Sequence, residues 1–206
     1  MNRRLIGSLC VLLAWSPWAG AQDGGWSFDP GVLAASGGDL LARTPDQQVD
    51  GLFQAVHATA QSDDEAQALC ALFEPDADRS LSGLNAFASQ LAPASRDRFA
   101  NAVADALVAA MQSSPRTFDA AAAKQSLKAA GATAAILHEG FVAGLSASGV
   151  DADSRALRCR SLRWLLDAVQ ARPPHERAAM TRLLLAEGIS RMAPASPDAQ
   201  GVERGK

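Results

Sequence analysis

The stretch SRDRFANAVADALVAAMQSS, residues 95–114, decides the fold that the sequence predicts. Placed on a helix at about 100° per residue, it gathers its polar side chains into one narrow stripe: Arg98, Asn101, Asp105 and Gln112. Most of the remaining circumference is apolar, with Phe99, Val103, Ala106, Leu107, Val108, Ala110 and Met111. A helix with so much apolar surface needs neighbours to enclose it, so we predict that 95–114 is the central helix of an all-α domain. It is too short, and too charged at its start, to cross a bilayer.

The first 21 residues have the pattern of a Sec-type signal peptide. A positive pair at residues 3–4 precedes an apolar run at residues 5–15, and Ala19-Gly20-Ala21 supplies the small residues that signal peptidase accepts. We therefore expect cleavage between Ala21 and Gln22 and a periplasmic or secreted protein. A retained membrane anchor is the weaker alternative, because the apolar run is too short to span a bilayer.

Composition and charge narrow the class of protein further. Alanine is abundant and tyrosine is absent, and alanine is the best helix former, so the composition favours helices. The chain has 19 Lys and Arg against 22 Asp and Glu, a net charge of −3 that becomes more negative when the leader is lost. This balance argues against nucleic acid or an anionic membrane as the main partner.

The domain is predicted to begin at Thr44. The sequence Thr44-Pro45-Asp46-Gln47 places a cap residue, a first-turn proline and a capping-box glutamine in register. Residues 22–43 are expected to be a flexible segment, since Gly37-Gly38 interrupts any helix there. Residues 44–192 then form one domain of about seven or eight helices, and residues 193–206 a disordered tail.

Glycines punctuate the second half of the predicted domain. An Ala-rich helix is expected to end at Gly131, and the next helix, over residues 133–147, carries the apolar residues Ile136, Leu137, Phe141 and Leu145. Gly140 and Gly144 lie four residues apart on this helix. We expect them to let another helix approach closely, as small residues do at helix–helix contacts.

Two cysteines remain after the leader and its Cys10 are removed. An exported chain meets an oxidising compartment, so Cys70 and Cys159 are predicted to form one disulfide. Closing a loop of this length stabilises a chain by roughly 4 kcal/mol in the chain-entropy model. Two inert buried thiols are the alternative.

No metal or cofactor site is predicted. Residues 76–80 and 151–153 resemble the opening of a calcium loop, but neither continues with the glycine and glutamate that the loop requires, so helix capping explains both better. The three histidines, His57, His138 and His175, fall on separate helices without a ligand pair one turn apart.

Glu139 is the one residue that could carry catalysis. An all-α fold can perform glycoside hydrolysis with a single carboxylic acid held protonated in an apolar pocket, and Glu139 lies between Leu137 and Phe141. The plainer interpretation is a solvated glutamate on the outer half of an amphipathic helix.

The best surface feature is the group Arg160, Arg163 and Trp164. Tryptophan and arginine are enriched at interface hot spots, because they bury a large area while they still make directed hydrogen bonds. Arg163 is also expected to pair with Asp167 one turn along the helix. In the alternative interpretation, Trp164 packs at the edge of the core and the arginines form a solvated face.

These features predict an exported, non-enzymatic module that binds another protein through Trp164, Arg160 and Arg163. One version of this function is an immunity or inhibitor protein that occludes another envelope protein. The alternatives are an envelope hydrolase of the peptidoglycan type that uses Glu139 as general acid, and a carrier of an apolar ligand between helices.

Overall fold

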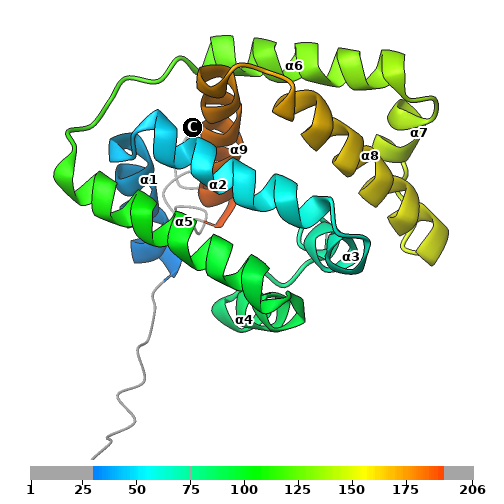
Figure 1. The fold of residues 1–206 in the computed structure, drawn as a ribbon, viewed down its shortest axis with the longest axis horizontal. Helices are drawn as coiled ribbons and strands as arrows, with labels where there is room; N and C mark the ends of the chain where they lie inside the picture. Colours follow the sequence, from blue (N-terminus) through cyan, green and yellow to red (C-terminus); the bar gives the residue numbers. More distant parts are fainter. Residues whose placement is uncertain (1–29, 75, 193–206) are drawn as a thin grey trace, which may run out of the picture.

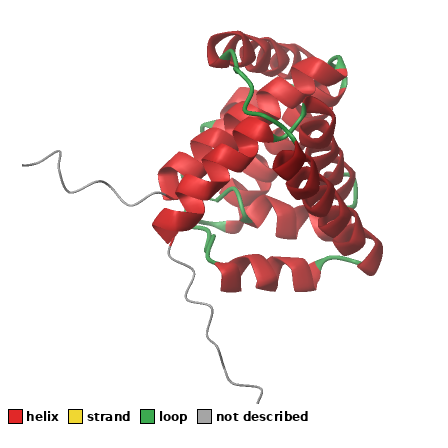
Figure 2. Ribbon diagram, turned by 90° about the vertical axis from the view of Figure 1, so that its left-hand side faces the viewer, coloured by secondary structure: helices red, strands yellow, loops and turns green. Residues whose placement is uncertain are grey.

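The computed structural model describes residues 30–74 and 76–192, and every regular element in this part of the chain is a helix (Figure 2). The predicted all-α class is therefore confirmed. None of the described helices is long and apolar enough to cross a membrane. In chain order the nine helices of the described residues, against the seven or eight expected, are α1 (Pro30–Arg43), α2 (Asp46–Ala60), α3 (Asp63–Ala71), α4 (Leu81–Gln90), α5 (Pro93–Gln112), α6 (Ala120–Leu137), α7 (Phe141–Leu145), α8 (Ala152–Gln170) and α9 (Pro174–Met192).

The helix at the centre of this bundle is α2. It contacts α3, α5, α8 and α9, and it crosses the middle of the molecule in Figure 1. Its buried side chains are spaced for neighbours on several sides: Val49, Phe53, Ala55, Thr59 and Ala60. Thr59 is fully buried, and its hydroxyl donates to the Ala55 carbonyl oxygen at 3.0 Å. The hydrogen-bond donor of this buried hydroxyl is therefore satisfied.

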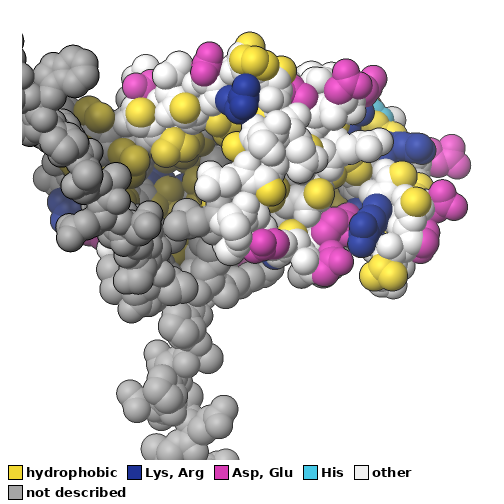
Figure 3. Space-filling model, turned by 90° about the horizontal axis from the view of Figure 1, so that it is seen from below, with side chains coloured by type: hydrophobic (Ala, Val, Ile, Leu, Met, Phe, Trp, Pro, Cys, Tyr) yellow, Lys and Arg dark blue, Asp and Glu magenta, His cyan; other side chains and the backbone are white. Residues whose placement is uncertain are grey.

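The prediction that residues 95–114 form an enclosed central helix is wrong. The corresponding helix is α5, and it packs on α2 and α1 through small side chains, with only Ser95, Ala106 and Ala110 buried. Its large apolar residues face outward; Met111 is 73% exposed, and Val103, Leu107 and Val108 are each more than 40% exposed. Figure 3 shows hydrophobic side chains at the surface on this lower side of the molecule, where α4 and α5 lie.

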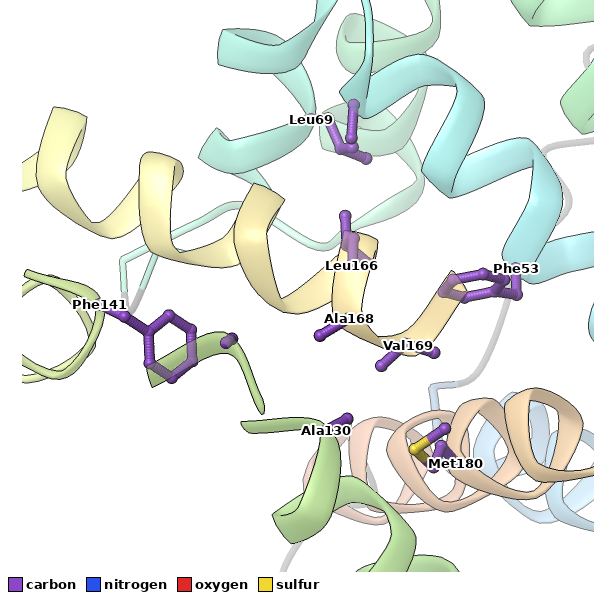
Figure 4. Packing of buried hydrophobic residues seen from close by; sticks show 10 residues of the cluster. Phe53, Leu69, Ala130, Phe141, Leu166, Ala168, Val169 and Met180 are labelled. Carbon is purple, nitrogen blue, oxygen red and sulfur yellow. The ribbon is translucent and has the colours of Figure 1, made fainter. Parts of the chain in front are cut away.

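The main core lies where α2, α3, α6, α7, α8 and α9 meet (Figure 4). Large side chains from α2, α7 and α9, among them Phe53, Phe141 and Met180, meet small side chains from α6 such as Ala130 and Ala134. Alanines on one face of α6 let it lie close to α8 and α9. The Ala-rich composition is thus used for close helix packing as well as for helix formation.

The N-terminal boundary differs from the prediction. The helix α1 continues through Gly37-Gly38 and packs against α5 and α9, so residues 30–43 belong to the bundle rather than to a flexible segment. Thr44 does not cap α2; its hydroxyl donates to the Leu40 carbonyl oxygen at 2.7 Å and so closes α1. The predicted leader 1–21, residues 22–29 and the predicted tail 193–206 lie outside the described residues.

The Cys70–Cys159 disulfide is present, as predicted. It joins α3 to α8 across 89 residues of sequence, with the two Cα atoms 5.3 Å apart. Next to it on α3, Leu69 is buried in the main core. The bridge therefore fixes two helices that are distant in sequence at the edge of the same core.

The glycines of the second half act differently from expectation. Gly131 lies inside α6, which runs on to Leu137, so the predicted helix end is wrong. The predicted single helix over 133–147 is also wrong, because α6 ends at Leu137 and Gly140, with φ +86°, lies in the turn from which α7 begins. A positive φ is a conformation that glycine adopts without steric cost. Gly144 does allow the close approach expected of it, since it lies against α8.

Substitution of Gly144 by alanine is expected to lower the free energy of unfolding by about 2 kcal/mol. A Cβ atom there would lie 2.1 Å from Ser161 Oγ and 2.6 Å from the Leu157 carbonyl oxygen, and the backbone oxygen cannot move without separating α7 from α8. Urea unfolding measures the change. As a matched control, Gly131→Ala lies inside a helix with no atom within 4 Å, and it should stabilise by about 0.5–1 kcal/mol. Effects of the same sign at both positions would contradict this packing.

Candidate protein-binding groove

The outer face of α8 brings Arg160, Arg163 and Trp164 together, as their spacing predicts. Asp151 caps the N-terminus of this helix; its carboxylate accepts from the Ser154 backbone N–H at 2.9 Å and from the Ser154 hydroxyl at 2.7 Å. These hydrogen bonds hold the pKa of Asp151 below its usual value, with the backbone bond the larger cause. In a helix, residues three and four positions apart lie on the same face. Arg160, Arg163 and Trp164 therefore share one face of α8, and this face is turned toward α3.

A groove runs between α3 and α8, and the three predicted residues line it. One part is a hollow of about 450 Å³ lined by Asp63, Ala66, Gln67, Ala156, Cys159, Arg160, Arg163, Trp164 and Asp167. The adjoining part, of about 330 Å³, is lined by Gln67, Cys70, Ala71, Glu74, Ala152, Arg155, Ala156 and Cys159. We call these two parts together the α3–α8 groove. Its alanines and disulfide sulfurs form an apolar surface between charged margins, as interface cores with polar rims do.

Trp164 is positioned by packing on both the core and a histidine. Its side chain is partly buried against the main core, and its ring stacks on His138 with centroids 4.7 Å apart and planes 3° from parallel. The interpretation of Trp164 as a residue at the edge of the core is therefore correct for part of its surface. The remaining surface lines the groove. A ring held in this way loses little conformational freedom when a partner covers it.

The predicted pairing of Arg163 with Asp167 is wrong. Arg163 instead reaches across the groove, where its Nη1 lies 2.8 Å from Asp63 Oδ1 on α3. Asp167 Oδ1 is occupied by two groups on and next to α2, with His57 Nε2 at 2.9 Å and Gln61 Nε2 at 2.8 Å. Asp167 therefore binds His57 and Gln61, which are distant in sequence, instead of Arg163 one helical turn away.

Of the arginines that line the groove, Arg160 is the one whose positive charge can bind a partner directly. Its side chain is exposed and has no ion-pair partner among the described residues. By contrast, Arg163 is paired with Asp63, and Arg155 lies 3.4 Å from Asp76. A carboxylate brought into the groove would therefore meet Arg160 without first breaking an existing ion pair.

Glu139 is not part of the groove. It lies in the turn between α6 and α7, where its side chain is exposed, rather than on a helix or in an apolar pocket. Neither of the two other histidines lines the groove: His57 on α2 contacts it only through Asp167, and His175 lies on α9. Within the described ranges, no three His, Cys, Asp or Glu side chains come together as a metal site would require.

Two features escape the sequence analysis. Arg158 on α8 forms a largely buried ion pair with Glu74, which follows α3, and it pins one end of the groove. The other feature is a set of exposed apolar residues around α7, among them Ile136, Leu137 and Leu145, which the sequence pattern places on a single helix over residues 133–147. That helix is interrupted between Leu137 and Phe141, and Gly140 was the sequence signal for the interruption.

Comparisons of the chain with protein-family models, curated proteins and solved structures find no match. The groove is therefore interpreted from its own residues.

Proposed function

We propose that this is an exported protein that binds another protein in the α3–α8 groove. The observation that carries the proposal is that Trp164, Arg160 and Arg163 line one hollow whose two walls are joined covalently by Cys70–Cys159. Walls fixed in this way need not be ordered when the partner binds, which lowers the entropic cost of association.

The chemistry of the groove indicates what the partner presents there. An apolar side chain would contact Ala66, Ala156 and the free surface of Trp164, and a carboxylate beside it would bind Arg160. Charge-assisted hydrogen bonds from arginine to a carboxylate are among the stronger polar contacts. An aromatic ring and an arginine next to each other are typical of interface hot spots.

Export supports this function and its immunity or inhibitor version. The signal-peptide pattern of residues 1–21 predicts an oxidising compartment, and a disulfide between two helices is the kind of bond that persists there. A small, rigid protein that occludes an envelope protein would use a preformed groove of this kind.

The two alternative functions receive less support. Glu139 is exposed in a turn, so it lacks the apolar surroundings that a general acid of the expected type needs. A carrier of an apolar ligand needs an enclosed apolar cavity. The hollows of the α3–α8 groove have charged side chains at their margins instead.

The test is capture of a partner by the purified mature protein and by matched charge variants. Wild type should recover one protein in stoichiometric amount from an extract of the source cells, and Arg160→Glu should reduce that recovery at least about tenfold, since a charge reversal at a hot spot costs more than 1.4 kcal/mol. Lys128→Glu, on the exposed face of α6 and outside the groove, is the control and should leave recovery unchanged. Equal recovery by Arg160→Glu and wild type, or no specific protein with wild type, would refute the proposal.

A further inference from the structure

A second surface runs along α7 and the turns on either side of it, from the end of α6 to the start of α8. Six large apolar side chains are exposed there, which we call the apolar tip: Phe73, Ile136, Leu137, Val142, Leu145 and Val150. Ile136 is 84% exposed and Val150 78%. Single exposed apolar residues are ordinary, but several that follow one another along a short stretch of surface mark an interaction site.

The geometry of α7 turns the apolar residues at the middle of this surface outward. Phe141 and Gly144 are buried, and Gly144 lies against α8, so Val142 and Leu145 occupy the outward side of this short helix. Leu145 and Phe73 line the same hollow, of about 200 Å³. In Figure 1, α7 occupies the corner beside the end of α6 and next to α8. The tip therefore joins segments that are more than 60 residues apart in sequence.

The loop between α7 and α8, which carries Val150, is held in place by the largely buried ion pair between Arg158 and Glu74. Arg158 Nη1 donates to the carbonyl oxygens of Ala147 at 2.9 Å and Gly149 at 2.7 Å, and the same guanidinium binds Glu74. The hydrogen bond to Glu74 raises the pKa of Arg158, so this anchor stays charged. Val150 is thus exposed on a fixed loop.

Acidic side chains surround the tip. Glu139 precedes α7, and Asp151 and Asp153 begin α8; all three are exposed. The hydrogen bonds from Ser154 lower the pKa of Asp151, which keeps it charged. Two of the nearby arginines do not offset this charge, because Arg155 is paired with Asp76 and Arg158 with Glu74. Arg79 donates to the carbonyl oxygens of Leu72 and Glu74 and adds one positive charge beside Phe73. Three carboxylates against this one guanidinium leave the margin of the tip net negative.

We infer that the apolar tip binds an amphipathic segment of a partner protein whose apolar residues are flanked by lysine or arginine. Such a segment would bury the six side chains and place its cations next to the acidic margin, as electrostatic complementarity requires. A second copy of this chain would bring one acidic margin against another, and an anionic membrane would be repelled in the same way. The hollow beside the tip uses residues 158 and 162 of α8, a different face from residues 156, 160 and 163 of the α3–α8 groove, so the two surfaces lie on different sides of α8 and meet only at Cys70, Glu74 and Cys159.

The experiment measures binding of two labelled synthetic 18-residue helical peptides to the mature protein by fluorescence anisotropy. Both carry the same leucine face; lysine flanks it in one peptide and glutamate in the other. The lysine peptide should bind at least about tenfold more tightly, and Val142→Ser with Val150→Ser should weaken it at least about tenfold. Glu139→Lys with Asp153→Lys should invert the preference. Leu107→Ser with Met111→Ser, on the exposed face of α5, is the control and should change nothing.

Other outcomes would overturn the inference. Equal affinity for both peptides would exclude charge recognition, and an equal loss in the α5 control would show that binding is not specific to the tip. A wild-type dimer that Val142→Ser dissociates would identify a second copy as the occupant. Binding to phosphatidylglycerol vesicles that the same substitution abolishes would identify a membrane. Circular dichroism should be the same for all variants, since every substituted side chain is exposed.

Discussion

Removal of the Cys70–Cys159 disulfide is expected to lower the free energy of unfolding by about 4 kcal/mol. The bond closes a loop between residues 89 apart in sequence, so it restricts the unfolded chain strongly. The folded state should persist without it, because Leu69 and Leu166 continue to pack α3 and α8 into the core. Urea unfolding of the wild type and of Cys70→Ser with Cys159→Ser, in the mature form, measures the difference.

A reducing agent provides the control for this experiment. It should destabilise the wild type by the same amount and leave the double serine variant unchanged. A difference below about 1 kcal/mol would show that the bond adds little to a folded pair of helices, and that the walls of the α3–α8 groove do not depend on it.

Substitution of Asp50 by alanine is expected to lower the free energy of unfolding by about 3 kcal/mol. Arg177 on α9 binds the carboxylate of Asp50 on α2 with two parallel hydrogen bonds of 2.8 Å, and the two side chains are only 13% and 16% exposed. Removing one partner leaves the other charge buried without its counter-ion. The bonds to Asp50 raise the pKa of Arg177 in the wild type, and a guanidinium stays protonated in proteins even without such a partner, so Arg177 cannot escape this cost by losing its proton.

An exposed ion pair of the same length serves as the matched control. Arg163 and Asp63 are also 2.8 Å apart, but Asp63 is 88% exposed, so Asp63→Ala should change stability by less than about 1 kcal/mol. Thermal and urea unfolding of both variants give the comparison. Similar losses at Asp50 and Asp63 would contradict the role assigned to burial.

The sequence predicts the helical class and the disulfide because both depend on local or compositional signals. It does not predict which helix is central. The periodicity of α5 shows a large apolar surface, but it cannot show that Ala106 and Ala110, rather than Leu107 and Met111, meet the neighbouring helices. Alanine permits the closest approach of two helices, so the small face is buried and the bulky face is exposed. Only the tertiary structure decides between the two.

Long-range polar contacts explain most of the other differences. Arg182 donates to the backbone of residues 41 and 44 and to Asp46 at 2.9 Å, which fastens the end of α1 to α9, and no local pattern indicates this. In the α3–α8 groove, helical spacing places Arg160, Arg163 and Trp164 on one face. The opposite wall, and the partner of Asp167 on α2, depend on packing between distant parts of the chain.

The most direct test of the account is a photo-crosslinking measurement at position 67 of the mature protein in source cells. Gln67 is exposed and lines both parts of the α3–α8 groove. A photoreactive amino acid in its place leaves Arg160 and Trp164 intact and should give one discrete adduct with a protein, and Trp164→Ala in the same chain should reduce that adduct at least about tenfold. The same amino acid in place of Lys128 on α6 should give none. A discrete adduct that Trp164→Ala leaves unchanged, or equal labelling at positions 67 and 128, would contradict binding in the groove.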